Sequence, residues 1–125
     1  MPVEVLALMR EREARFVRGN GDRDLTGWQA ERLAKAELAL LRVWPTTVTL
    51  EVDGLGLVVF CHGSPRADDE ILTRITPDDV VDEVCSGSAV VVGGHTHVQF
   101  DRVAGRTRCV NAGSVGMPYE DLRGT

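Results

Sequence analysis

Apolar and polar positions along the chain predict two helices in its first third. Apolar side chains recur at helical spacing over residues 4–15, and the short segment 16–18, Phe-Val-Arg, then predicts a strand. Residues 26–29 fit a capping box, and leucines recur at helical spacing from there until Pro45, which cannot continue a helix. We therefore expect a second helix over residues 26–44.

After this proline the pattern changes to the period of strands. Val48, Leu50 and Val52 alternate with polar residues, which indicates a half-buried strand over 47–52 and a hairpin turn at Asp53-Gly54. The further predicted elements are a buried strand over 55–61, a helix that opens at 76–79 and ends near Gly87, and strands over 89–92, 98–103 and 106–110. No repeat or low-complexity linker interrupts this order, so we expect one mixed α/β domain over residues 1–125.

The composition is that of a folded protein and limits the classes of function. Hydrophobic residues make up 43% of the 125 residues and charged residues 26%, which excludes a disordered tail. Fourteen basic and nineteen acidic residues give a net charge of −5. This balance argues against a surface that follows long nucleic acid by charge alone, although it does not exclude small anionic substrates.

Membrane insertion and disulfide bonds are not predicted either. The longest apolar run, Gly54 to Cys61, is far shorter than the roughly 18 residues that span a bilayer, and the first residues do not resemble a signal peptide. Cys61, Cys85 and Cys109 have no CxxC spacing and lie in or beside apolar segments. We expect buried thiols in a reducing compartment, and hence a cytoplasmic protein without membrane partners.

The chemistry-bearing residues gather at the ends of predicted strands. His62 follows the strand 55–61, and His95 and His97 follow the strand 89–92 through two glycines. Asn20 has the same position after residues 16–18. In α/β sheets, ligands bind where strands open into such loops.

A single histidine after a strand is more often a hydrogen-bonded structural residue, but all three histidines of the chain share this position. Metal ligation is the natural use of converging imidazoles. On an extended backbone, His95 and His97 would point to the same side and serve one site or two adjacent sites. A zinc finger is disfavoured by the cysteine spacing, and Ser64 and Ser114 lack the elbow sequence of a serine hydrolase.

Three motifs follow one another in a specific order: Gly19-Asn20-Gly21-Asp22, His62-Gly63 and Gly94-His95-Thr96-His97. This order resembles the last three motifs of the calcineurin-like metallophosphoesterases, and in particular of their small bacterial and archaeal phosphodiesterase branch. The segment 111–116, Asn-Ala-Gly-Ser-Val-Gly, is similar to the glycine-rich segment of that branch. The resemblance extends over residues 4–119. It implies a partial calcineurin-like two-sheet α/β sandwich flanked by helices.

The resemblance also implies a set of metal ligands. Asn20, His62 and His95 would bind one ion, and His97 would bind its neighbour. An intact site of the family holds two divalent transition-metal ions, and imidazole and amide ligands suit Mn, Fe, Ni or Zn. The implied activity is hydrolysis of phosphodiester or nucleotide phosphoester bonds by a metal-activated hydroxide, with a small phosphoester as substrate.

Two further residues beside the motifs have a weaker implied role, and no catalytic residue is implied beyond the ligands. Asp22 would orient a metal ligand without contacting the ion itself, or would simply cap its own loop. Arg66 would contact the phosphate, as would Arg23, or each would be a solvated arginine.

Departures from the family pattern limit these expectations. The family supplies two earlier motifs, an Asp-x-His and a Gly-Asp, which carry the ligands of the first ion and the bridging carboxylate. No Asp-x-His occurs in this sequence, so we expect the domain to be incomplete at its N-terminal side. Gly21 stands where many relatives have a histidine that is a candidate acid for the leaving group. The remaining ligands are neutral, so one ion or none is expected here.

Three hypotheses remain open at this stage. The first is a metal-dependent phosphoesterase, with little turnover by this chain alone. The second is a non-catalytic remnant of that fold that binds one metal ion or a protein partner. The third is a structural fragment that forms a homo-oligomer through an exposed sheet edge.

Overall fold

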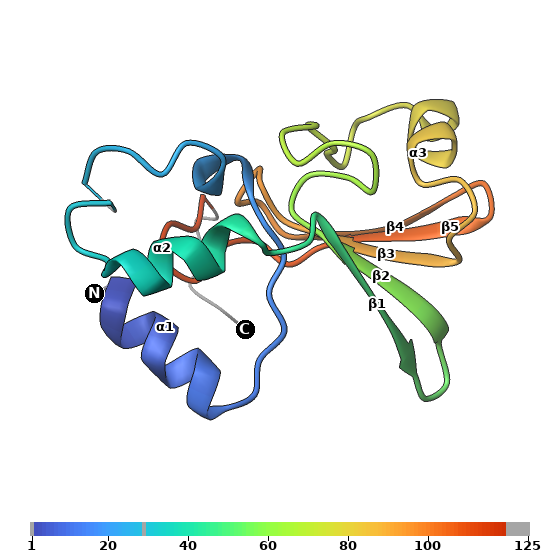
Figure 1. Cartoon of the computed structure of the whole chain (residues 1–125). Helices are drawn as coiled ribbons and strands as arrows, with labels where there is room; N and C mark the ends of the chain where they lie inside the picture. The colour runs from blue at the N-terminus through green and yellow to red at the C-terminus, as the bar shows by residue number, and fades with distance from the viewer. Residues whose placement is uncertain (1, 29, 120–125) are drawn as a thin grey trace.

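The computed structural model describes residues 2–28 and 30–119, which form helices beside a five-stranded sheet (Figure 1). In chain order the elements are α1 (Pro2–Glu11), the 3-10 helix η1 (Asn20–Asp22), α2 (Lys35–Arg42), β1 (Thr47–Val52), β2 (Gly56–Cys61), α3 (Asp78–Val84), β3 (Val90–Gly93), β4 (Phe100–Ala104) and β5 (Thr107–Asn111). The mixed α/β class predicted from the sequence is confirmed. None of the helices in the described ranges is long and apolar enough to cross a membrane.

The sheet has a parallel centre and antiparallel edges. Its strand order is β1-β2-β3-β5-β4, with β2, β3 and β5 parallel and the hairpin partners β1 and β4 antiparallel to their neighbours. Phe60 pairs with Val92, and Val92 pairs with Val110. The carboxyl ends of the three central strands therefore lie at one edge of the sheet, where their following loops can meet.

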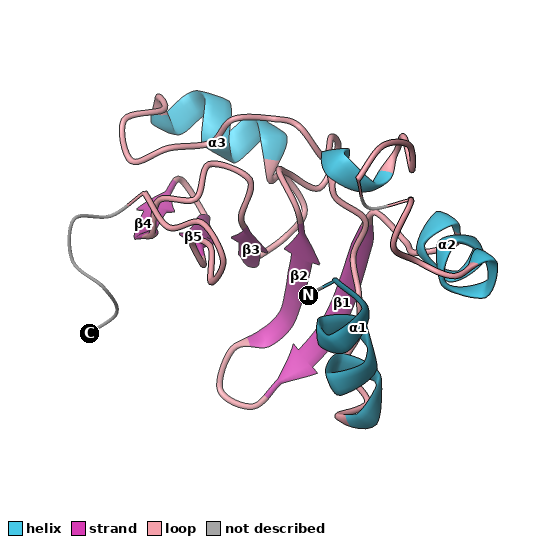
Figure 2. Cartoon of the chain, turned by 90° about the vertical axis from the view of Figure 1, so that its left-hand side faces the viewer, coloured by secondary structure: helices cyan, strands magenta, loops and turns pink. Residues whose placement is uncertain are grey.

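The main core lies between the sheet and α3, which covers one sheet face (Figures 1 and 2). Val81 from the helix, Cys85 directly after it, and Val91 and Cys109 from the strands are almost fully buried in it. All three cysteines are free and buried, as the sequence predicts. A continuous apolar surface on the helix and strands explains why this layer forms.

A second, smaller core joins the N-terminal helices. Leu6 of α1 packs with Leu33 and with Leu41 of α2, and the Phe16 and Trp44 rings stack beside them with centroids 4.5 Å apart. In Figure 1 these helices lie to one side of the sheet rather than over it. The described residues thus contribute one sheet, whereas the two-sheet sandwich implied by the resemblance has a second.

Three sequence predictions about elements are wrong in detail. Residues 16–18 join no sheet, and the Arg18 N–H instead donates to the carbonyl of Pro45 at 2.7 Å. The first helix ends at Glu11, because Glu13 has a left-handed φ of 52°. The second helix begins only at Lys35, since Gly27 has a φ of 71° that no helix contains. The predicted capping box falls partly on residue 29, which lies outside the described residues.

Candidate metal centre

The central strands bring their loops together through backbone hydrogen bonds. His62 directly follows β2, and its carbonyl accepts the N–H of Gly94, which directly follows β3, at 2.7 Å. The N–H of Ala112, after β5, donates to the carbonyl of Gly93 at 2.9 Å. These contacts bring the His-Gly and Gly-His-Thr-His motifs to the same edge, as their predicted positions at strand ends require.

Asn20, His62 and His95 form a cluster at this edge. His62 Nε2 lies 2.9 Å from Asn20 Oδ1, and the His62 and His95 ring centroids are 5.2 Å apart in a T-shaped arrangement. Two ligand atoms about 2.1 Å from one ion, at right angles to each other, are separated by about 3 Å. The Asn20–His62 separation therefore matches two neighbouring positions in one coordination sphere.

The position of the His62 ring depends on Gly19. A Cβ at Gly19 would lie 3.0 Å from two atoms of the ring and 3.1 Å from a third. The Gly19 N–H donates to Asp22 Oδ2 at 2.9 Å, so the carboxylate closes the η1 turn that presents Asn20. The structure thus places Asp22 as the cap of its own loop, two residues from the amide that contacts His62.

The Gly-His-Thr-His motif is not extended, which corrects the sequence expectation about its two histidines. His95 and His97 have left-handed φ values of 63° and 61°, and the Thr96 N–H donates back to the Gly94 carbonyl at 2.7 Å. Side chains two residues apart point to the same side only in an extended strand, so this rule does not apply to the turn that carries His95 and His97. His95 instead faces His62, whereas His97 donates its Nδ1 proton to the carbonyl of Met117 at 2.8 Å.

Electrostatics around His62 favour its neutral form. Partial burial lowers the pKa of His62 below its ordinary value, the nearby His95 and His97 lower it further, and the Asp22 carboxylate opposes this shift. A neutral imidazole has the free lone pair that a metal ion requires. In the structure the His62 Nε2–H donates to Asn20 Oδ1 at 2.9 Å, and a bound ion would take the place of this proton between the two atoms.

Comparison with known proteins identifies the fold to which this site belongs. The sequence model of the calcineurin-like phosphoesterase superfamily domain matches residues 2–125. The chain belongs to this superfamily. Among curated proteins, no sequence matches it at a significant level.

Two solved structures have the same calcineurin-like phosphoesterase fold. A hypothetical protein from Pyrococcus horikoshii superposes with a TM-score of 0.74 at 15% identity, over 93% of this chain and 57% of that one. A metallophosphoesterase from Sphaerobacter thermophilus superposes with a TM-score of 0.68 at 23% identity, over 94% of this chain and 61% of that one. This chain therefore spans about three fifths of the length of either structure.

The donor set of this phosphoesterase domain fits one metal ion. One amide oxygen and two imidazoles are ligands that suit transition metals, and His62 contacts each of the other two residues. None of the three is an anionic ligand. Within the described ranges, no three His, Cys, Asp or Glu side chains gather in a group that could hold an ion. Of the predicted ligands, only His97 is available for a neighbouring ion.

The two arginines beside the motifs are already paired with carboxylates. Arg66 Nη2 lies 2.6 Å from Glu70 and its Nη1 lies 3.0 Å from Glu83. Arg23 pairs with Asp68 and, at 3.0 Å, with Asp69. Both guanidinium groups would have to leave these partners to reach a phosphate, so we do not include them in the proposed site.

Two residues that shape the site were missed at the sequence level. Asn111 is buried, and its side-chain amide donates to the Gly94 carbonyl and to Thr96 Oγ1, which fixes the turn that carries His95. Met117 orients His97 through its backbone carbonyl. The sequence contained a signal for Asn111, because this residue opens the Asn-Ala-Gly-Ser segment. It contained none for Met117, because a contact made by the backbone carbonyl does not depend on the residue type.

Proposed function

We propose that this chain carries the histidine-containing part of a metal-dependent phosphoesterase that hydrolyses phosphodiester or nucleotide phosphoester bonds. The observation that supports this most directly is the 2.9 Å approach of His62 Nε2 to Asn20 Oδ1, beside His95, in a calcineurin-like phosphoesterase domain. We assign Asn20, His62 and His95 as ligands of one divalent transition-metal ion, such as manganese. When bound, such an ion supplies the positive charge that polarises a phosphoryl group and activates water.

The residues of the chain itself prepare the ligands for this role. The Met117 carbonyl accepts the Nδ1 proton of His97, so Nε2 is the ring nitrogen that remains for an ion or a substrate. Gly19 leaves room for the His62 ring, and Asp22 holds the turn that presents Asn20. Asn20, His62 and His97 are therefore oriented before binding, which reduces the entropic cost of assembling the site.

A second candidate function is a non-catalytic metal-binding or protein-interaction domain of the same fold. The neutral donor set favours it, because three uncharged ligands neutralise none of the charge of a divalent ion and hold it weakly. This candidate predicts that the chain binds an ion without hydrolysing phosphodiesters.

Charge at position 20 offers a sharp test of the ligand assignment. Asn20→Asp should tighten manganese binding on the order of tenfold, because a carboxylate replaces the neutral oxygen 2.9 Å from His62. Asn20→Leu should abolish this binding. Thr49→Glu, on the exposed side of β1, changes the net charge equally at a remote position and should have no effect. Calorimetric titration that finds equal affinity in all three variants would contradict the assignment.

Hydrolysis of bis-p-nitrophenyl phosphate in the presence of manganese separates the two candidates. Turnover that requires the metal and disappears in His95→Ala supports the phosphoesterase. One bound ion per chain without turnover supports the second candidate. An absence of bound manganese in the wild-type chain contradicts the phosphoesterase and the metal-binding form of the second candidate, and leaves only its protein-interaction form.

A further inference from the structure

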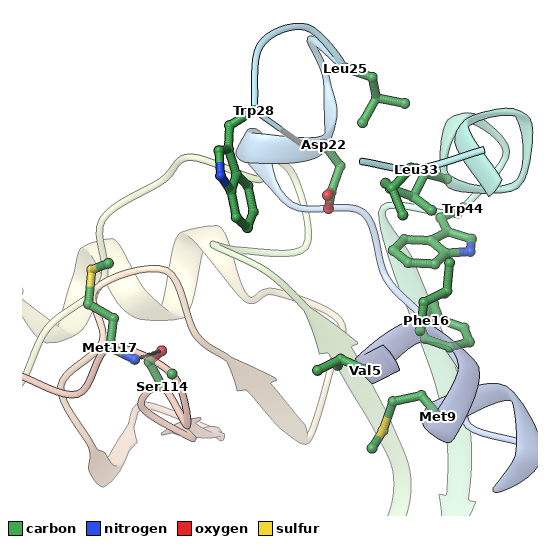
Figure 3. Close-up of a pocket in the computed structure, with 13 residues that line it drawn as sticks. Val5, Met9, Phe16, Asp22, Leu25, Trp28, Leu33, Trp44, Ser114 and Met117 are labelled. Carbon is green, nitrogen blue, oxygen red and sulfur yellow. Dashed lines mark hydrogen bonds between the residues drawn. The ribbon is translucent and has the colours of Figure 1, made fainter. Parts of the chain in front are cut away.

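An apolar cavity of about 800 Å³ lies between α1, α2 and the loop 114–117 (Figure 3). Its walls are leucine, valine, methionine and aromatic side chains, and the Trp28 and Trp44 rings lie at opposite sides of it. Asp22 supplies the only charged side chain and Ser114 the only hydroxyl group among the described residues that line it. A cavity of this size and composition is typical of sites for small organic molecules.

The cavity shares two of its walls with the candidate metal centre. The η1 turn presents Asn20 to His62, and from the same turn Asp22 lines the cavity. The loop 114–117 also contacts both the metal centre and the cavity, on the other side. Its Met117 carbonyl accepts the Nδ1 proton of His97, while Met117 itself lines the cavity. A molecule bound at the metal centre could therefore extend directly into the cavity.

The lining selects which part of a substrate can enter. Asp22 repels a phosphate group, so the anionic end of a phosphoester belongs at the histidines and only its organic part fits the cavity. Among the lining residues, Val5, Trp28 and Met117 are each more than half exposed overall, at 54%, 53% and 56%, and a bound apolar group would bury the part that faces the cavity. Arg32 lies over the Trp28 ring at 4.2 Å from its centroid and supports it as a stacking surface.

We propose that this cavity binds the apolar organic group of the phosphoester substrate, and that the preferred substrates are phosphodiesters with an aromatic ester group. This proposal rests on the proposed function, since the phosphoester is placed at the histidine cluster. It goes beyond the proposed function because it names a class of substrate and the residues outside the metal site that would select it. An aromatic ring gains both apolar burial and stacking on Trp28, whereas a small alkyl ester would leave most of the cavity to water.

Both tryptophans of the chain line this cavity, so their fluorescence reports on its contents. Metal-free protein titrated with diphenyl phosphate should show a saturable change in tryptophan emission. Dimethyl phosphate, with the same charge and no ring, should give none over the same concentrations. Because these titrations contain no metal, their result is independent of ligation by Asn20, His62 and His95.

A variant that fills the cavity provides the second measurement. Gly116 lines the cavity, and a Cβ added there meets no atom within 4 Å, so the backbone can accept Gly116→Phe and the added ring should occupy the space. It should weaken diphenyl phosphate binding by at least about tenfold. Val115→Phe places the same ring on the neighbouring, fully exposed residue and should bind diphenyl phosphate as the wild type does.

The outcomes separate this proposal from the proposed function. Absence of a diphenyl phosphate response, or equal responses to both phosphates, overturns the cavity assignment even if manganese binds. A concentration-dependent dimer that Gly116→Phe dissociates also overturns it, because a second copy of the chain would then cover the cavity. Aromatic selectivity without manganese binding instead supports the cavity assignment and contradicts the metal site.

Discussion

Gly63, directly after His62, is predicted to tolerate no side chain. A Cβ at this position would lie 2.8 Å from the Ala67 carbonyl oxygen, 2.8 Å from the Glu70 nitrogen and 2.9 Å from the Asp68 carbonyl carbon. All three are backbone atoms, so they cannot turn away as the end of a flexible side chain could. Each contact is at least about half an ångström shorter than ordinary van der Waals contact. The loop after β2 would have to move.

The cost of Gly63→Ala follows from this displacement. Overpacking of this kind costs about 1–3 kcal/mol. Movement of the loop also weakens the Ser64 N–H to Ala67 carbonyl hydrogen bond of 2.8 Å, which contributes about 1 kcal/mol. We expect the free energy of unfolding to fall by about 2–4 kcal/mol, and the melting temperature by roughly 5–15 °C for a chain of this size.

Thermal unfolding followed by circular dichroism measures this loss. Gly21→Ala is the matched control, because an added Cβ there meets nothing within 4 Å and should change the unfolding free energy by less than about 0.5 kcal/mol. The reasoning would be refuted if Gly63→Ala unfolded within about 0.5 kcal/mol of the wild type, or if both variants lost equal stability.

Three further predictions concern the core and its connections. Val81 is 1% exposed and Val80 is 39% exposed. In urea titrations, Val81→Ala should therefore lower the free energy of unfolding by about 2 kcal/mol and Val80→Ala by less than about 0.5 kcal/mol. Equal losses would contradict the described core. Burial raises the pKa of Cys61 from 9.0 to about 12. The folded state therefore favours the neutral thiol, its full contribution is present below about pH 9, and it is lost as the pH rises from about 9 to about 12. Cys61→Ala should make the fall of unfolding free energy in this range shallower, and an unchanged pH dependence would refute this. The Arg102 guanidinium donates to three carbonyls of residues 73–76, at 2.7–3.1 Å. Arg102→Met should therefore lower the unfolding free energy by about 1–3 kcal/mol in thermal unfolding, and an unchanged melting temperature would show that these bonds contribute nothing.

The strands could be predicted because their signal is local. The alternation of Val48, Leu50 and Val52 and the apolar segments that become β2 and β3 decide how each strand buries its side chains, whatever its partners are. Residues 16–18 carry a similar apolar signal, yet they form no strand. A strand exists only where a second chain segment completes its hydrogen bonds, and the Arg18 N–H finds the Pro45 carbonyl instead.

The sequence alone determined which residues with metal-binding side chains stand in the loops of the site: His62 and His95 shortly after the strands β2 and β3, His97 two positions after His95, and Asn20 between two glycines. Only the tertiary structure decided how they meet. It brought Asn20 and His62, 42 positions apart, to 2.9 Å, and it directed His97 to the Met117 carbonyl through a left-handed turn. The physical reason is that local patterns fix which side chains a segment buries. The distances between segments depend on strand register and on backbone hydrogen bonds formed far away along the chain.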